Sequence, residues 1–501
     1  MLNANLNFNI NIADDDIHLS SHAYMHLYRT FGKIAEEHGF KIYIVGGFVR
    51  DLLIYKIHDC YKTCNILEKP VDIDICVEGD ATIFAEILKQ ELHKFEKNIY
   101  IYNIKKHERF KTATIVFSGV FSGVFSSISE NIINIDFASA RKEFYVKSGA
   151  LPEVKFSDLE HDLIRRDFSI NALALNLGPD NFFKIIDYHN GIKDIVDKKI
   201  RVMHVLSFID DPTRIFRAVR FEKRLGFRIE KNTKKLLTDA LLKGVMAHIS
   251  GKRISNELNL IFQENHPEIY FLRLERLGAL KSIDKDLKFT PGNKKNFERI
   301  RNFYQSNKEN INAMKINDMN IKNANSIKIN IELLYLMELL IRLKDEKILY
   351  ILERLNFGEN IKKLFLLIKA ENKSIKKVIC KDIDNINMLH INAEKNTNFK
   401  SRLYLAMKSF NLYSIIFFIM RYNNKSDSVL NRINAYLKIY LFEIINIKLD
   451  ISGEDLKKLG FKEGPEIGKI LNRLKLLKID GIIKSKEEEI EYIKSEYNIK
   501  T

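Results

Sequence analysis

The stretch KIYIVGGFVRDLL, residues 41–53, predicts a short buried strand, a turn at Gly46 and Gly47, and a helix after the turn. Backbone amides at a helix N-terminus attract phosphate, and glycines let an anion approach them closely. Arg50 lies one turn into the expected helix, so its planar guanidinium could bind the same phosphate. The simpler alternative is a tight turn that needs glycine for a positive φ and binds no ligand.

A pair of acidic residues follows in the stretch VDIDICV (71–77), whose alternating pattern predicts a strand. Side chains alternate across a strand, so Asp72 and Asp74 project from the same face. Two neighbouring carboxylates repel unless a cation lies between them, and Mg²⁺ prefers such oxygen ligands together with phosphate oxygens. Asp136, on a later strand, could supply a third carboxylate. The alternative is a solvated strand face, but with the glycine turn upstream the acids indicate a metal-bound nucleoside triphosphate.

The remaining patterns divide the chain into a sheet-forming part and a helical part. TATIVF (112–117) and NIINIDFAS (131–139) predict further strands. LIRRDFSINALAL (163–175) and PTRIFRAVRFEKRLGF (212–227) carry apolar residues at helical spacing, and beyond about residue 285 nearly every segment predicts helix. The expected fold class is therefore α+β, with a small mixed sheet followed by a long array of helices.

The segment DDPTRIFRAVRF (210–221) places charges at three-residue steps. Asp211 and Arg214 would lie on one face of the expected helix, and Arg217 continues the row. A carboxylate accepts from an exocyclic amine and a guanidinium donates to ring acceptors, so this pair could read the edge of a base while Arg217 holds phosphate. The alternative is an ion-paired, solvated helix.

The composition of the chain narrows its class. Its 501 residues are 46% hydrophobic and 29% charged, which is typical of globular proteins of several domains. The net charge of +16 favours an anionic partner such as nucleic acid or nucleotide. Four cysteines are too few for a disulfide framework, and we find neither a signal-peptide pattern nor an apolar run of membrane-spanning length. We therefore expect a cytoplasmic protein with no membrane association and no obligate protein partner.

Six motifs of the chain occur in the order found in the class II (bacterial) tRNA nucleotidyltransferases. That family includes CCA-adding, CC-adding and A-adding enzymes and bacterial poly(A) polymerases. The chain resembles it over roughly residues 41–260, and a seventh motif, DLKKLGFKEGPEIGKILNRL (455–474), is similar to the C-terminal helical element of the longer members. The six motifs are GGFVRDLL, VDIDICVEGD, ERFKTATIVF, RRDFSINALAL, DDPTRIFRAVRF and ISGKRISNEL.

The resemblance implies a polymerase-β-like nucleotidyltransferase head followed by an all-helical neck, body and tail. By this division the head spans 1–160, the neck 161–285, the body 286–450 and the tail 451–501. The implied activity is template-independent transfer of CMP, AMP or both from CTP and ATP to the 3′ end of tRNA, with Mg²⁺ as cofactor. The alternatives are a poly(A) polymerase and, from another class, a non-catalytic RNA-binding scaffold.

The resemblance also assigns roles to residues at matching positions. Asp72 and Asp74 match the metal-binding catalytic carboxylates, and Asp136 matches a further catalytic acid by its strand position. The expected nucleotide contacts are Gly46, Gly47, Arg50 and Arg217 at the triphosphate, Arg165 and Asp167 at ribose and phosphate, and Asp211 and Arg214 at the base.

In the tail, Lys469, Arg473 and Lys475 follow glycine-marked turns on a predicted helix. Helix N-termini and basic side chains of this kind suit the phosphates of tRNA. The alternative is a packed terminal helix whose basic face is only solvated.

Three features depart from the family pattern. Asp210 stands where glutamate is usual, so its role in orienting the base-reading pair is open. Cys60 and Cys64 lie in a link of unusual length before Asp72, and no second cysteine pair follows that would complete a zinc site. The repeat FSGVFSGVFSS (117–127) lengthens a hairpin near the expected active site.

Overall fold

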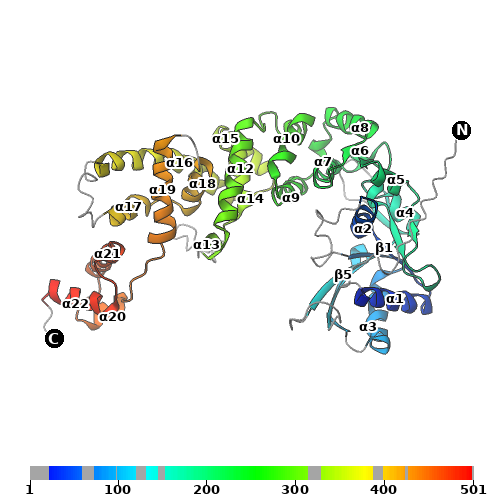
Figure 1. Ribbon diagram of the computed structural model, residues 1–501, viewed down its shortest axis with the longest axis horizontal. Coiled ribbons are helices and arrows are strands. Elements are labelled where there is room, and N and C mark those ends of the chain that lie inside the picture. Colours follow the sequence, from blue (N-terminus) through cyan, green and yellow to red (C-terminus); the bar gives the residue numbers. More distant parts are fainter. Residues whose placement is uncertain are drawn as a thin grey trace. The chain divides into compact units, whose positions relative to one another are not determined.

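The computed structural model describes most of the chain, which forms two compact units (Figure 1). The N-terminal unit comprises residues up to 257 together with 277–283, and the C-terminal unit comprises 258–276 and the residues from 284 onward. Asp72, Cys60, Cys64 and most of the FSGV repeat lie outside the described residues, so the expectations placed on them stay predictions. The described residues are 22–58, 73–96, 99–119, 131–144, 153–313, 329–387, 399–423 and 427–498.

A seven-stranded mixed sheet forms the centre of the N-terminal unit, as the sequence predicts. The strand order is β3-β4-β5-β2-β1-β8-β9, in which β2 and β5 pair in parallel and the other neighbours are antiparallel. Two smaller sheets pair β6 with β7 and β10 with β11. The strands are β1 (Lys41–Val45), β2 (Ile73–Glu78), β3 (Ile99–His107), β4 (Thr112–Gly119), β5 (Asn131–Ser139), β6 (Arg141–Phe144), β7 (Glu153–Phe156), β8 (Ala174–Asn176), β9 (Ile185–Ile186), β10 (Lys199–Ile200) and β11 (Arg228–Ile229).

Most of the remaining described residues are helical. The helices of the N-terminal unit are α1 (His22–Glu37), α2 (Gly47–His58), α3 (Ala81–Phe95), α4 (Leu159–Ile164), α5 (Gly191–Val196), α6 (Ser207–Asp210), α7 (Arg214–Arg224), α8 (Lys231–Leu242) and α11 (Ala279–Ile283). Helix α9 (Gly251–Phe262) continues into the C-terminal unit, which is formed by α10 (Pro267–Leu277), α12 (Pro291–Ser306), α13 (Lys308–Ala313), α14 (Ile331–Leu340), α15 (Asp345–Arg354), α16 (Glu359–Asn387), α17 (Phe399–Met407), α18 (Leu412–Tyr422), α19 (Ser428–Ile439), α20 (Gly453–Lys458), α21 (Pro465–Ile479) and α22 (Lys486–Glu496). Within the described residues no single helix meets the length and apolarity of a membrane span, although α17 and α18, bent by 109°, do so as a pair.

Helices α1 and α3 cover one face of the large sheet (Figure 1). Phe31 of α1 and Phe84 of α3 meet Phe137 of β5, with ring centroids 5.8 and 5.9 Å apart. All three side chains are fully buried, and each contributes about 1.5–3 kcal/mol through the hydrophobic effect. Helix α3 starts at Ala81, because the carboxylate of Asp80 accepts from the backbone N–H of Thr82 and caps the helix.

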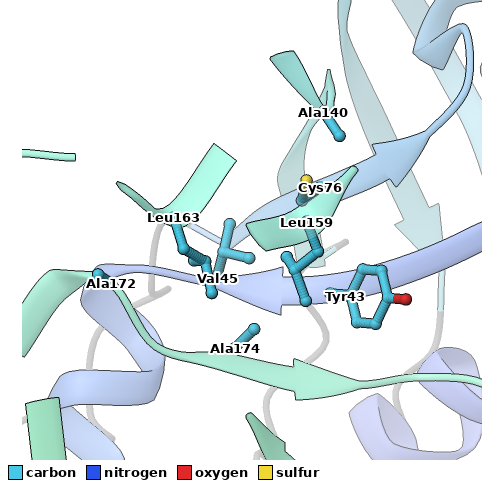
Figure 2. Packing of buried hydrophobic residues seen from close by; sticks show 8 residues of the cluster. All are labelled: Tyr43, Val45, Cys76, Ala140, Leu159, Leu163, Ala172 and Ala174. Carbon is cyan, nitrogen blue, oxygen red and sulfur yellow. The ribbon is translucent and has the colours of Figure 1, made fainter. Parts of the chain in front are cut away.

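Helix α4 packs against β1 and β2 on the opposite face of the sheet (Figure 2). Leu159 and Leu163 of this helix lie over Val45 and Cys76. Burial, together with the nearby Asp162 carboxylate, raises the pKa of the Cys76 thiol well above its usual value. The thiol therefore acts as a small apolar side chain in this cluster.

The prediction of a helix over residues 163–175 is wrong. Helix α4 ends at Ile164, a single 3-10 turn covers Ser169–Asn171, and the chain then enters the sheet as β8, where Ala174 pairs with Val45. A short apolar run is ambiguous by periodicity, and here pairing to β1 decides its conformation. The sheet therefore includes residues 174–186, which the sequence division assigns to the neck.

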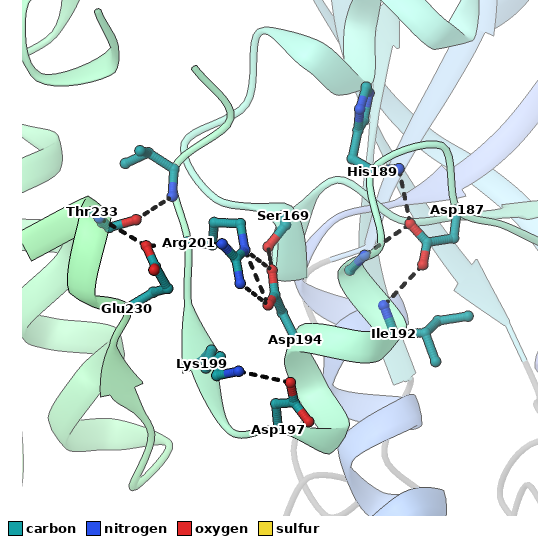
Figure 3. A network of polar contacts seen from close by, with 12 residues as sticks. Ser169, Asp187, His189, Ile192, Asp194, Asp197, Lys199, Arg201, Glu230 and Thr233 are labelled. Carbon is teal, nitrogen blue, oxygen red and sulfur yellow. Dashed lines mark hydrogen bonds and ion pairs between the residues drawn. The ribbon is translucent and has the colours of Figure 1, made fainter. Parts of the chain in front are cut away.

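A buried polar network fixes the segment that follows the sheet (Figure 3). The carboxylate of Asp194 is 2% exposed and accepts from the Ser169 hydroxyl at 2.6 Å and from the Arg201 guanidinium at 2.9 Å. A buried carboxylate is stable only when it is paired in this way. The network holds the turn Ser169–Asn171 against α5 and so positions the side chains that the site uses.

The described part of the tail has its own small core. Helices α20, α21 and α22 share an apolar cluster. Glu489 of α22 is fully buried and accepts from the backbone N–H groups of Asp450 and Ile451 and from Lys478 Nζ. The tail thus stays compact through one buried acid as well as through its apolar residues.

Candidate functional site

Two acidic side chains meet on the uncovered part of the sheet. Asp74 of β2 and Asp136 of β5 are direct partners in the parallel register, so both project from the same face. Both are exposed, and the Thr114 hydroxyl donates to Asp136 Oδ1 at 2.6 Å. The oxygen ligands brought together here are of the type that Mg²⁺ prefers. Asp72, the third expected ligand, lies outside the described residues.

The glycine turn lies directly beside this acidic pair. Val45, the register partner of Asp74, precedes Gly46, and α2 begins at Gly47. Gly46 has φ = +79°, which favours glycine, and a Cβ added there would lie 2.8 Å from Arg166 Nη1 and 4.0 Å from Asp74 Oδ2. The turn therefore needs glycine for its conformation and for the close approach of a guanidinium.

Arg50 of α2 enters a continuous polar chain. Its Nη1 donates to Asn171 Oδ1 at 2.7 Å, and Asn171 Nδ2 donates to Asp167 Oδ1 at 2.9 Å. Asp167 Oδ2 accepts from Arg217 Nε at 2.7 Å. The structure thus brings together three of the predicted nucleotide-binding residues, Arg50, Asp167 and Arg217, and joins them through Asn171, which the sequence analysis missed.

The carboxyl group of Asp167 is held ionised within this chain of contacts. Burial raises its pKa, but the charge of Arg217 and the hydrogen bonds from Asn171 and Arg217 outweigh burial and lower it below the ordinary value. Asp167 is only 9% exposed. A buried charge that depends on its partners makes this position sensitive to the loss of any one of them.

Phe221 of α7 gathers three guanidinium groups around its ring. The Cζ atoms of Arg50, Arg217 and Arg220 lie 5.0, 5.5 and 5.8 Å from the ring centroid. Cation–π attraction favours these positions and keeps the positive charges close together. Each of the three is also paired with a carboxylate, namely Asp51, Asp167 and Glu257 respectively, so an anion such as a triphosphate would share these guanidiniums with the acids.

The predicted base-reading pair is close together but not on one helix. Arg214 is the first residue of α7, and Asp211 lies one turn before it, with the Arg214 N–H donating to the Asp211 carbonyl at 3.1 Å. The Asp211 carboxylate accepts from Thr213 and from Arg253 Nη2, at 2.6 and 2.7 Å. Arg214 Nη2 donates to the Arg165 carbonyl at 2.8 Å. The two side chains therefore find other partners instead of the mutual ion pair of a solvated helix.

A pocket of about 290 Å³ opens beside Asp211, which lines it, whereas the buried Arg214 does not. Glu257 lines it, and burial raises the pKa of this carboxyl despite the charges of Arg217 and Arg220. The pocket thus offers two carboxyl groups, two guanidiniums, a hydroxyl and an amide, groups that can accept from and donate to the edge of a base. Its lining residues are Asp211, Thr213, Arg217, Arg253, Asn256 and Glu257.

Arg165 and Arg166 share one buried carboxylate. Asp162 is 1% exposed and accepts from Arg165 Nε at 3.0 Å and from Arg166 Nη2 at 3.0 Å. Burial raises the pKa of Asp162, but the two guanidiniums outweigh burial and lower it. The family pattern predicts a ribose or phosphate contact for Arg165, whereas Arg166 is the guanidinium that lies against Gly46.

Asp210 stands where the family usually has glutamate. Its Oδ2 atom lies 3.8 Å from Nε2 of His204. Burial and the charge of Arg214 lower the pKa of His204. Asp210 thus faces a histidine rather than bracing Arg214.

In the tail, α21 presents Lys469 and Arg473 one turn apart on its exposed side. Arg473 Nε lies 3.4 Å from the Tyr492 hydroxyl. Lys475 is half-buried, and burial together with the charges of Lys478 and Lys448 lowers its pKa. The three predicted RNA-binding residues are therefore not equivalent, since only two of them are exposed.

Two family models match the chain. One, described as "Poly A polymerase head domain", matches residues 42–201. The other, described as "Probable RNA and SrmB- binding site of polymerase A", matches residues 226–289. The first includes the acidic pair, the glycine turn, Arg50, Asp167 and Asn171, and the second includes Arg253 and Glu257 of the pocket. Asp211, Arg214 and Arg217 lie between the two matched segments.

Named relatives and a solved structure are similar to the chain over most of its length. It is 30% identical to the A-adding tRNA nucleotidyltransferase of Geobacter sulfurreducens over 92% of this chain and 46% of that protein. It is 28% identical to the A-adding tRNA nucleotidyltransferase of Aquifex aeolicus over 87% of this chain and 44% of that protein. The structure of the Thermotoga maritima CCA-adding enzyme complexed with tRNA matches with a TM-score of 0.62 and 28% identity, over 94% of this chain and 95% of that chain. The chain spans about half the length of these two curated relatives.

Proposed function

Because the chain belongs to the class II tRNA nucleotidyltransferase and poly(A) polymerase family, we propose that it transfers AMP, CMP or both from ATP and CTP to the 3′ end of tRNA without a template. The observation that carries this proposal is the in-register pair Asp74 and Asp136, which lies beside the glycine turn at the start of α2. Acids for a divalent metal and a helix N-terminus for phosphates are what transfer from a nucleoside triphosphate requires.

The triphosphate would lie between the N-terminus of α2 and the arginines next to it. The backbone amides after Gly46 and the guanidiniums of Arg50, Arg166 and Arg217 supply donors and positive charge for the β- and γ-phosphates. The 3′-hydroxyl of the RNA attacks the α-phosphate in line, and pyrophosphate leaves on the opposite side. The arginines would stabilise the leaving pyrophosphate by neutralising its charge.

The carboxylates Asp74 and Asp136, with Asp72, would hold Mg²⁺, for which their oxygen atoms are suitable ligands. When bound as a pair, such ions lower the pKa of the attacking hydroxyl and stabilise the leaving oxygen.

Base selection would belong to the pocket formed by Asp211 and its neighbours. Cytosine and adenine both offer an exocyclic amine beside a ring acceptor, whereas guanine and uracil place a carbonyl at that edge. A carboxylate can accept from the amine and a guanidinium can donate to the ring nitrogen. Arg253 holds one oxygen of Asp211 and so leaves the other for the base.

The RNA would be bound through its backbone and shape. The net charge of +16 supports an extended phosphate contact, and the exposed Lys469 and Arg473 place part of that charge on the tail. The corresponding partners are tRNA and the two nucleotides, in a cytoplasmic setting. Deletion of the tail should therefore weaken the affinity for RNA more than the affinity for nucleotide.

The choice of nucleotide is decided by a product ladder. Both named bacterial relatives are A-adding enzymes, which favours AMP addition to a tRNA that already ends in CC, while the matched structure is a CCA-adding enzyme. The full chain is given tRNAs ending in the discriminator base, in C or in CC, with CTP and ATP supplied separately. Extension of only the CC-ending tRNA by ATP assigns A addition, extension of all three assigns CCA addition, and long products with ATP assign poly(A) synthesis. No extension of any substrate would refute the proposed function.

A further inference from the structure

The open face of the sheet continues past the acidic pair. Helix α4 covers this face over β1 and over Cys76 of β2 but leaves Asp74 exposed, and β5, β4 and β3 present further exposed side chains beyond it. Residues that are register partners across these strands share the face, which gives the row Asp136–Thr114–Lys105 and, farther along the strands, the row Ile132–Ser118–Tyr100. Between these rows lies a third, Asn134–Val116–Asn103.

Two large, mainly apolar side chains are exposed on this face. Tyr100 on the edge strand β3 is 64% exposed, and Ile132 on β5 is 55% exposed. Polar side chains, Asn103 and Asn134, lie between them and the acidic pair. With a rise of about 3.3 Å per residue and about 4.8 Å between strands, Tyr100 lies roughly 16 Å from Asp136. We call the face formed by Tyr100, Asn103, Lys105, Val116, Ile132 and Asn134 the β3–β5 surface.

The geometry of the transfer reaction determines which substrate must lie on this side. The glycine turn and the arginines adjoin β1, on one side of β2, while β5, β4 and β3 lie on the other. In an in-line displacement the attacking hydroxyl and the leaving pyrophosphate lie on opposite sides of the α-phosphate. If the triphosphate lies at the β1 side, the 3′ end of the RNA must reach the acids over β5.

We propose that the β3–β5 surface binds the last unpaired nucleotides of the RNA, with Tyr100 stacking on a base, Ile132 packing beside it and Lys105 contacting the backbone. This inference rests on the proposed function. Aromatic side chains stack on any base, which suits a surface that must hold the same RNA end whether or not a nucleotide has been added. Strand β3 carries no acidic residue, and Lys105 is the basic side chain that it contributes to this face, so its charge complements phosphate. Lys106 alternates to the opposite face, where it pairs with Glu86 of α3 at 2.7 Å.

The test measures the KM values of variants of the full chain. The two substrates are ATP and an RNA stem–loop whose 3′ end is a single-stranded CC. Tyr100→Ala should raise the KM for RNA about 5- to 100-fold, since a base is no longer stacked, and leave the KM for ATP unchanged. Tyr100→Phe keeps the ring and should restore a KM close to that of the wild type. Ile132→Ala should raise the KM for RNA, whereas Ile83→Ala should not. Ile83 is a matched control because it is also 55% exposed but lies on α3, which covers the opposite face.

A second measurement separates this inference from the proposed function. Binding of a fluorescent single-stranded oligonucleotide is followed by anisotropy, without nucleotide. If the wild type binds the oligonucleotide but shows no transfer, and Tyr100→Ala loses that binding, RNA binding by the β3–β5 surface is supported and the proposed transferase function is refuted. Wild-type KM and wild-type oligonucleotide binding in both Tyr100→Ala and Ile132→Ala would overturn the surface. A change in self-association rather than in RNA binding in these variants would also overturn it, because the edge strand would then serve a second copy of the chain.

Discussion

Replacing Gly46 by alanine tests whether the glycine turn and Arg166 act as one unit. The left-handed conformation at φ = +79° costs a residue with a side chain about 1–2 kcal/mol. The new Cβ would also lie 2.8 Å from Arg166 Nη1, so this guanidinium must move. Arg166 Nη2 donates to the buried Asp162, and loss of a charged hydrogen bond costs about 1.5–3 kcal/mol. We therefore expect Gly46→Ala to cost about 2.5–5 kcal/mol in all.

Gly226 supplies a matched control for the conformational cost of placing a side chain at positive φ. It has φ = +67° and nothing within 4 Å of an added Cβ, so Gly226→Ala should cost only the conformational 1–2 kcal/mol, about 2–8 °C in the thermal midpoint. Gly46→Ala should lower the midpoint of the same transition about twice as far and should also raise the KM for ATP, which Gly226→Ala should not do.

A double-mutant cycle isolates the contribution of Arg166. In an Arg166→Ala background no guanidinium opposes the new Cβ, so Gly46→Ala should then cost about as much as Gly226→Ala. The measurement is thermal unfolding of the four chains at one pH, with ATP titration of those that fold. If Gly46→Ala costs the same with and without Arg166, the proposed coupling between the turn and this arginine is wrong.

Three further outcomes follow from the site. Asp211→Ala should narrow the preference for ATP and CTP over GTP and UTP about ten- to a hundredfold, and Arg214→Ala should lower incorporation of ATP and CTP more severely. Competition assays with all four nucleotides measure this preference, and a wild-type preference in both variants would refute base reading by this pair. Asp167 has a pKa below its unfolded value, so its contribution to stability is present above about pH 4 and is lost as the pH falls through the folded pKa. Asp167→Asn should therefore lose less stability than the wild type between about pH 5 and pH 3, and parallel pH profiles of the thermal midpoint would contradict this. Deletion from about residue 452 onward should weaken tRNA binding and flatten its salt dependence with little change in ATP affinity, and an unchanged salt slope in the folded truncation would make the tail structural.

The local sequence was sufficient where a short pattern determines the structure. The apolar stretch before Gly46, the glycine turn and the helix after it follow from composition and turn chemistry over about a dozen residues. The same holds for β5, whose alternation predicts both the strand and the exposed position of Asp136. The facing of Asp74 and Asp136, by contrast, depends on a parallel register that no single strand reveals.

The contacts that join the site could not be predicted, because their partners are far apart along the chain. Arg50 and Asn171 are 121 residues apart, and Asp211 and Arg253 are 42 apart. Periodicity carries no information on such pairings. Asn171 and Arg253 do lie within two of the family motifs, RRDFSINALAL and ISGKRISNEL, but the motifs do not say which residues they contact.

Substitution of Asp74 shows whether the face that bears it carries out nucleotidyl transfer. Asp74→Asn keeps the shape of an exposed side chain and removes its charge. Incorporation from labelled ATP into a tRNA ending in CC is measured with Mg²⁺, and tRNA binding is measured in parallel as the control for folding. We expect the wild type to incorporate AMP, and Asp74→Asn to lose incorporation while binding tRNA as well as the wild type or more tightly. Incorporation by Asp74→Asn at a rate close to that of the wild type would contradict it.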